Sequence, residues 1–197
     1  MMSVYPYVEF VHIAAIVLWL GGGSLSVFSA VKAERAHNAA DFARVLSDTV
    51  FFSMRLFVPA GLVAFACGLA MAYLAELFSE LWIWIGIAGF AVTFLTGAAV
   101  IRPRAEKLLP LIRSGGAAAD VFGPGREIIA IAKFDYVMLF TIVSDMVLKP
   151  GPTDTAVLTA MAVVVVGAGV VFLRPLFKAS ASGAAGGPAK GWRRPNP

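Results

Sequence analysis

Four stretches of this sequence, each about as long as a membrane-spanning helix, contain no charged side chain. They are residues 10–31, 56–75, 81–101 and 155–173. About twenty apolar residues in helical conformation cross the hydrocarbon core of a bilayer, which is roughly 30 Å thick. The composition agrees, because 59% of the residues are hydrophobic and only 14% are charged, against about half and a quarter in soluble domains. The sequence therefore predicts a helical integral membrane protein.

A fifth candidate span, residues 128–148, is long enough but contains Lys133, Asp135 and Asp145. The basic residues decide whether it crosses, because Lys and Arg collect in cytoplasmic loops. With five crossings and the N-terminus outside, all but one of the 16 basic side chains lie on the cytoplasmic side, and the exception is Lys149. We therefore expect an all-α polytopic bundle of five transmembrane helices, with its N-terminus outside and its C-terminus cytoplasmic.

The chain divides into a bundle and a tail. Residues 1–177 form the predicted transmembrane bundle, and residues 178–197, rich in Ala, Gly, Ser and Pro, are predicted to be a disordered cytoplasmic tail. Residues 32–49 and 102–113 mix charges with apolar residues at helical spacing, so we expect them to lie along the cytoplasmic membrane surface. Because the basic residues flank spans, the net charge of +4 reflects topology, and we expect no binding of nucleic acid.

Two charged side chains enter predicted spans from the same side, Arg55 in the second span and Asp135 in the fourth. An uncompensated charge at the centre of a bilayer costs about 2.5–3.5 kcal/mol on insertion scales. We therefore predict that Arg55 and Asp135 pair between helices, and an inner polar pocket for a substrate is the alternative. Pro59 removes a backbone donor one turn after Arg55, so the second span should bend beside a buried cation.

The first span carries His12 with a pattern of residues on the same helix face. Trp19 follows seven residues later and Gly23 eleven residues later, so the three share one side of a helix, with Gly22 beside them. A neutral imidazole is a common metal ligand. A flat macrocycle against this face would meet the histidine near one edge, an aromatic ring beside it and no side chain further along.

Three methionines, Met71, Met146 and Met161, fall near the depth of His12 if successive spans alternate in direction. Soft sulfur ligands with imidazole suit copper(I), and methionine with histidine also suits haem iron. Methionine is equally a common filler of gaps in apolar cores. A metal site and simple packing therefore both remain open at these positions.

The run of His12, six residues, Trp19, one residue and two glycines resembles the first helix of copper-resistance protein D-type domains and of HemJ-type protoporphyrinogen oxidases. Over about residues 7–177 the chain is most similar to a related family of predicted bacterial integral membrane proteins of unknown function. The resemblance implies a helical bundle in the bacterial inner membrane in which His12 is a ligand of b-type haem. HemJ-type proteins continue with a segment bearing Arg and His, which residues 24–30 lack, so the resemblance implies a cofactor site rather than an oxidase.

Three functions follow for testing. The first is haem binding, with His12 as an axial ligand and Met71, Met146 or no protein group opposite it. The second is copper binding or passage through His12, the three methionines and Cys67. The third is a structural subunit without cofactor, which packs against a membrane partner or a second copy through small residues at every fourth position of the second span. Those small residues are Ala60, Ala64, Gly68 and Ala72.

Overall fold

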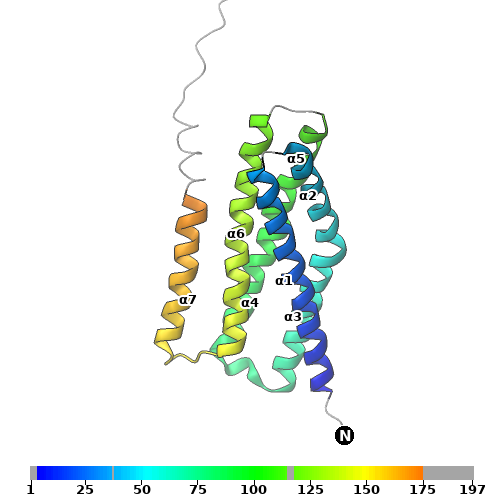
Figure 1. Ribbon diagram of the computed structural model, residues 1–197. Coiled ribbons are helices and arrows are strands. Elements are labelled where there is room, and N and C mark those ends of the chain that lie inside the picture. Colours follow the sequence, from blue (N-terminus) through cyan, green and yellow to red (C-terminus); the bar gives the residue numbers. More distant parts are fainter. Residues whose placement is uncertain (1–3, 37, 115–117, 175–197) are drawn as a thin grey trace, which may run out of the picture.

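Every regular element in the described part of the chain is helical (Figure 1). The computed structural model describes residues 4–36, 38–114 and 118–174. The helices are α1 (Tyr5–Arg35), α2 (Ala39–Phe52), α3 (Val58–Leu74), α4 (Leu81–Leu95), α5 (Arg102–Arg113), α6 (Ala118–Leu148) and α7 (Thr155–Ala168). The all-α prediction is confirmed for these residues. The predicted tail, residues 178–197, lies outside them, as do residues 175–177 of the predicted bundle.

Short π-helical segments join the helices in two places. The segment η1 (Ser53–Phe57) connects α2 to α3, and η3 (Thr96–Ile101) connects α4 to α5. In η1 the Val58 N–H donates to the carbonyl five residues back instead of four. A proline has no N–H, and its ring clashes with the carbonyl four residues earlier; Pro59 and Pro103 each come two residues after such a segment. The irregularity predicted at Pro59 thus takes the form of a π-helical turn.

The helices are longer than a bilayer is thick, and this corrects the placement of two segments. With 31 residues and a rise of about 1.5 Å per residue, α1 is about 46 Å long, against about 30 Å of hydrocarbon. Most of residues 32–49 and 102–113, expected along the membrane surface, instead extends the long helices. Ala40–Leu74 and Leu81–Ile112 each form one continuous helix. These extensions project at one end of the bundle (top of Figure 1). We call this the basic end, because of the arginines in α2 and α5.

A buried apolar cluster lies at the basic end. Its members come from α1, α2, α5 and α6, and they are Ala33, Phe42, Leu46, Ala105, Leu108, Val121, Ile128 and Ile129. On its surface Arg126 Nε lies 2.7 Å from Glu34 Oε1 and forms an ion pair. Because these helices are longer than the hydrocarbon is thick, we expect water to surround this end, where the hydrophobic effect would then drive the burial of these side chains.

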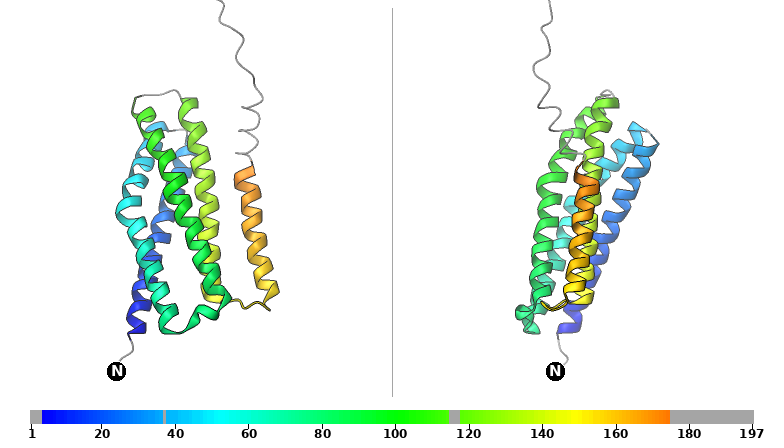
Figure 2. Two further views of the ribbon diagram at one scale, coloured as in Figure 1. Left: turned by 180° about the vertical axis from the view of Figure 1, so that it is seen from behind. Right: turned by 90° about the vertical axis from the view of Figure 1, so that its left-hand side faces the viewer.

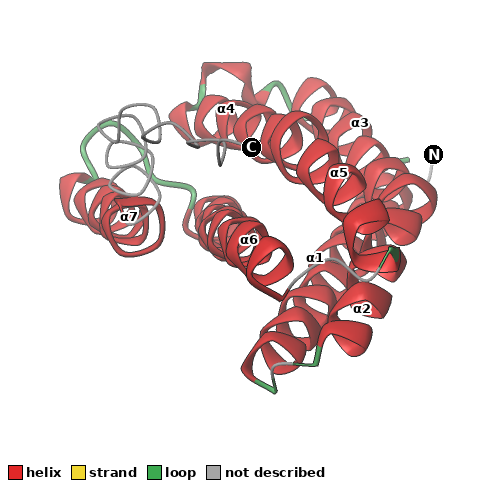
Figure 3. Cartoon of the chain, turned by 90° about the horizontal axis from the view of Figure 1, so that it is seen from above, coloured by secondary structure: helices red, strands yellow, loops and turns green. Residues whose placement is uncertain are grey.

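Along the remainder of the bundle many large apolar side chains point outward. Phe10, Leu25 and Phe28 of α1 are 71%, 70% and 70% exposed. In lipid such exposure costs nothing, because acyl chains are as apolar as the side chains themselves. Within the bundle α1 packs mainly against α3. Helix α7 packs against α6 and stands to one side of the other helices (Figures 2 and 3).

Among the described residues four helices are long and apolar enough to cross a membrane, and they contain the four predicted charge-free spans except Ala75. They are Tyr5–Arg35, Ala40–Leu74, Leu81–Ile112 and Thr155–Leu173. The fifth candidate lies in α6, a continuous helix of 31 residues that runs beside α1 and α4 (Figures 1 and 2). Its apolar half contains Lys133, Asp135 and Asp145, so it is less apolar than the other four.

Candidate functional site

His12 on α1 faces α3. Its Nδ1 lies 2.6 Å from the carbonyl oxygen of Ala64, and its Cε1 lies 3.1 Å from the position that a Cβ would take on Gly68. A carbonyl can only accept a hydrogen bond, so the imidazole donates through Nδ1 and the neutral ring keeps its lone pair on Nε2. Gly68, one of the small residues predicted to allow close helix packing, makes room for this ring, and Ala64, another of them, supplies the carbonyl.

The same helix also covers Trp19, but not the two glycines of the predicted cofactor face. The indole of Trp19 lies 3.5 Å from the position of a Cβ on Gly61, and Gly22 packs against an aromatic ring of η1. Around Gly23 there is open space. A porphyrin lying flat from His12 across Trp19 would occupy the space of α3, so this arrangement does not fit. Haem binding at His12 stays a prediction.

The methionines of the predicted metal site have different neighbours. Met146 packs on the α4 side of α6, with its methyl group against Gly86, whereas Met161 lines an apolar groove between α6 and α7. Met71 is half-buried near the end of α3. Within the described ranges no group of three or more His, Cys, Asp or Glu side chains could hold a metal ion. Copper binding through methionines stays a prediction, but Met146 and Met161 do not share a site.

The predicted ion pair between Arg55 and Asp135 is wrong. The Arg55 side chain is exposed, and its guanidinium carbon lies 4.1 Å from the ring centroid of Phe51, a cation–π contact within one helix. Asp135 Oδ1 is buried and has no hydrogen-bond partner in the described part of the chain. The sequence placed both charges near the same end of the bundle, but the rotation of each helix turns Arg55 outward and Asp135 inward.

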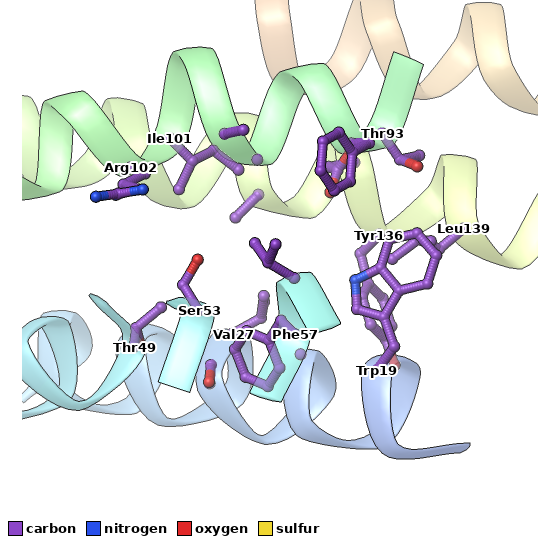
Figure 4. Close-up of a pocket in the computed structure, with 18 of the residues that line it drawn as sticks. Trp19, Val27, Thr49, Ser53, Phe57, Thr93, Ile101, Arg102, Tyr136 and Leu139 are labelled. Carbon is purple, nitrogen blue, oxygen red and sulfur yellow. The ribbon is translucent and has the colours of Figure 1, made fainter. Parts of the chain in front are cut away.

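The structure has a largely apolar cavity in this region, with a few polar side chains on its wall. A cavity of about 140 Å³ lies between α1, η1, η3 and α6, toward the basic end of the bundle (Figure 4). Polar side chains from four helices reach its wall, namely Trp19, Ser26, Thr49, Ser53, Thr93, Arg102, Asp135 and Tyr136. The volume suffices for several water molecules or one small molecule. Most of the remaining wall is aliphatic or aromatic.

Most hydroxyl groups around this cavity already have partners, but the carboxyl group does not. The Tyr136 hydroxyl forms a hydrogen bond with Ser24 Oγ, and Thr93 Oγ1 donates to the carbonyl of Phe90 at 3.1 Å. Arg102 lies at the opposite end of the cavity from Tyr136 (Figure 4). Its Nε donates to a carboxylate of the next helical turn at 2.7 Å. The Oδ1 of Asp135 is therefore the one buried, unpartnered side-chain oxygen among the described residues of the wall.

A second buried acid lies further along α6. Asp145 is fully buried, and neither of its carboxyl oxygens has a hydrogen-bond partner among the described residues. Its Oδ2 lies 3.7 Å from the position of a Cβ on Gly86 of α4. Lys149, one turn later, extends over the ring of Trp82 instead, with Nζ 5.4 Å from the ring centroid. Asp135 and Asp145, the two acids in the apolar half of α6, thus direct buried carboxyl oxygens toward neighbouring helices.

Two features of this cavity were not predicted from the sequence. Its wall includes parts of two π-helical segments, η1 and η3, and such segments are frequent at functional sites. The signal for them is the pair Pro59 and Pro103, each following an apolar run. The inward direction of Asp135 had no comparable signal, because it depends on how α6 is rotated against α1 and α4.

These observations define a helical integral membrane protein with a cavity between its helices. Residues 6–150 match the family model described as "Predicted integral membrane protein (DUF2269)", and the chain belongs to this family. The match confirms the predicted resemblance to integral membrane proteins of unknown function, and it includes His12 and the whole cavity but ends before α7. A relationship to copper-resistance protein D-type or HemJ-type domains stays a prediction. No curated protein and no solved structure matches the chain.

Proposed function

We propose that the protein crosses the bacterial inner membrane five times, with its N-terminus outside and α6 as the fourth crossing. The objection to α6 as a crossing is that its apolar half carries charged residues. For the two acids of that half, Asp135 and Asp145, the direction of the side chains answers this objection. Asp135 borders the cavity with its Oδ1 buried, and Asp145 is fully buried, so these carboxyl groups are directed away from lipid, where charged side chains are most costly. The basic end then lies in the cytoplasm, as expected from the collection of Lys and Arg on that side.

Single cysteines test this topology in a Cys67→Ala background. Ser114 and Thr153 flank α6 and are both exposed, so Ser114→Cys and Thr153→Cys report its two ends. A membrane-impermeant maleimide added to intact cells should label Thr153→Cys and leave Ser114→Cys unlabelled until the cells are opened. Ser79→Cys, in the short segment between α3 and α4, is the control for the outer side. Equal labelling of the two positions that flank α6 would refute the fourth crossing.

We further propose that this protein binds a small ligand in the cavity beside Asp135. The observation that carries the proposal is the buried Oδ1 of Asp135, which has no partner among the described residues and belongs to a side chain that borders the cavity. An acceptor buried without a partner costs about 1–3 kcal/mol, and more when it is charged. A ligand that donates a hydrogen bond or carries a positive charge would remove this cost. Ionisable residues inside a membrane bundle commonly mark such binding or passage sites.

A panel of three probes of similar size tests this site. Ethylammonium carries a positive charge, propionamide carries a neutral hydrogen-bond donor, and propionate carries a negative charge. Binding at 100 times the dissociation constant stabilises a folded protein by about 2.7 kcal/mol, so a rise in the melting temperature of the detergent-purified protein reports binding. We expect ethylammonium or propionamide to raise it, propionate to leave it unchanged, and Asp135→Leu to abolish the rise. No rise with any probe, or an equal rise in the variant, would refute the site.

Two glycines of the cavity wall provide a variant that fills the site without a clash. A Cβ added at Gly23 or Gly97 meets no atom within 4 Å, and both residues line the cavity. The double variant Gly23→Ala and Gly97→Ala should therefore fold normally and bind the probes more weakly. Gly21→Ala, also without a neighbouring atom but outside this wall, is the matched control.

A metal centre at His12 is the second candidate function. The observation that favours it is the hydrogen bond from Nδ1 to the Ala64 carbonyl, because such a bond fixes the ring and leaves Nε2 available to a metal. An absorption spectrum of the purified protein and an elemental analysis for iron and copper test it. A Soret band that is lost in His12→Ala would support haem, and copper without this band would support the copper alternative. A colourless protein with neither metal would refute both.

A further inference from the structure

Four aromatic side chains border the cavity that contains Asp135, and each comes from a different helical segment. They are Trp19 of α1, Phe57 of η1, Phe94 of α4 and Tyr136 of α6. Figure 4 shows Trp19 and Tyr136 together at one end of the cavity, with the Phe57 ring on the wall between them and Ser53. An aromatic ring presents a negative face to a cation within about 6 Å of its centroid. The wall thus combines several such rings with one carboxyl group.

Neighbouring aromatic contacts hold part of this wall. Trp19 meets Phe90 edge to face, with ring centroids 5.7 Å apart, and Phe90 stacks on Phe94 at 5.4 Å. Tyr136 lies edge to face with Phe140, at 5.1 Å. Side chains fixed in this way lose little entropy when a ligand binds, which favours affinity.

We infer that the ligand of this cavity is a small alkylated ammonium ion. The inference rests on the proposed ligand site and names its chemical class. A carboxyl group without a partner attracts a positive charge, and the aromatic and aliphatic wall suits the alkyl groups that cover this charge. A bare metal cation fits less well, because it needs several oxygen ligands, and here one carboxyl group has to supply most of them.

The charge of Arg102 does not oppose a cation near Asp135. Arg102 lies at the far end of the cavity from Trp19 and Tyr136 (Figure 4). Its Nε is 2.7 Å from Glu106 Oε1, and its Nη1 lies 2.8 Å from the sulfur of Met54. The guanidinium is therefore paired, and the unpaired group of the cavity is the acid.

Calorimetric titration of the detergent-purified full-length protein tests the inference. Tetramethylammonium chloride is the probe, tert-butanol is a neutral molecule of the same shape, and potassium chloride supplies charge without alkyl groups. We expect saturable binding of tetramethylammonium and none of the two controls. Equal binding of tert-butanol or potassium would overturn the inference, because either the charge or the alkyl groups would then be irrelevant.

Variants identify the groups responsible. Asp135→Asn should abolish binding, and Phe94→Leu should weaken it about 2- to 30-fold, the range expected for loss of one cation–π contact. Asp48→Asn, at an exposed carboxylate of α2, is the matched control and should not change the affinity. If Asp135→Asn does not fold, the effect of Phe94→Leu and the two control probes still decide the outcome.

The results separate this inference from the proposed site. If ethylammonium or propionamide binds in a manner that depends on Asp135 but tetramethylammonium does not, the site stands and the alkylated ammonium class is wrong. If no probe binds, both fall. Binding of tetramethylammonium that is unchanged in both Asp135→Asn and Phe94→Leu would place it outside this cavity and would also overturn the inference.

Discussion

Truncation of Phe42 tests whether the basic end of the bundle is a core surrounded by water. Phe42 is 2% exposed and belongs to the apolar cluster formed by α1, α2, α5 and α6. Its ring approaches Gly125 of α6 so closely that a Cβ there would lie 2.7 Å from Cζ. The matched control is Phe28 of α1, which is 70% exposed in the part of the helix that we assign to the membrane. Both variants remove the same atoms.

The expected magnitudes differ because the surroundings differ. A buried phenylalanine replaced by alanine costs about 3–5 kcal/mol, the sum of lost burial and of the cavity that remains. For a protein of this size that corresponds to a fall in melting temperature of about 6–20 °C. Detergent covers the Phe28 side chain before and after unfolding, so Phe28→Ala should cost less than about 0.5 kcal/mol, as for other positions outside a packed core.

Thermal unfolding in detergent, followed by circular dichroism, measures both values under identical conditions. We expect Phe42→Ala to melt well below the parent protein and Phe28→Ala to melt with it. Equal shifts for the two variants, or a cost below about 1 kcal/mol for Phe42→Ala, would show that the basic end is not a packed core and would refute the argument from helix length.

Three further predictions use the same melting assay. Asp145→Leu removes two buried oxygens that have no partner among the described residues, so stability should rise by about 1–3 kcal/mol; a loss would reveal a hidden partner. The loss of stability in Asp135→Arg should not be reversed by Arg55→Glu, since the two side chains do not pair. A reversal would show that the predicted ion pair exists. Gly22→Ala places a Cβ 2.5 Å from a ring carbon of η1 and should cost about 1–3 kcal/mol, whereas Gly21→Ala, with open space around it, should not destabilise.

The order of the helices could be predicted from the sequence because it depends on the length and hydropathy of each segment taken by itself. Apolar runs of span length give the four apolar helices, and Pro59 marks the irregular turn within one of them. The small residues Ala64 and Gly68 indicated a close helix approach, and α1 does pack there through His12. Each of these signals lies within a single segment, so no knowledge of a neighbouring helix was needed.

The candidate site could be read only in part. His12, Trp19 and Gly23 share a helix face as predicted, but the sequence does not reveal that α3 occupies the space in front of His12 and Trp19. Asp135 was recognised as a costly intramembrane charge, yet its expected partner, Arg55, points away from it. The carbonyl that accepts the His12 hydrogen bond lies 52 residues away in the chain, so no local pattern predicts it.

Length, hydropathy and proline positions by themselves determined that this chain is a helical membrane protein and where its helices run. The tertiary structure alone decided which way each polar side chain points, because that direction depends on the rotation of each helix against its neighbours. Hydropathy sums the charges of α6 without regard to direction, whereas packing turns Asp135 toward a cavity and buries Asp145 against α4. Both the cavity and its unpartnered acid arise from that rotation.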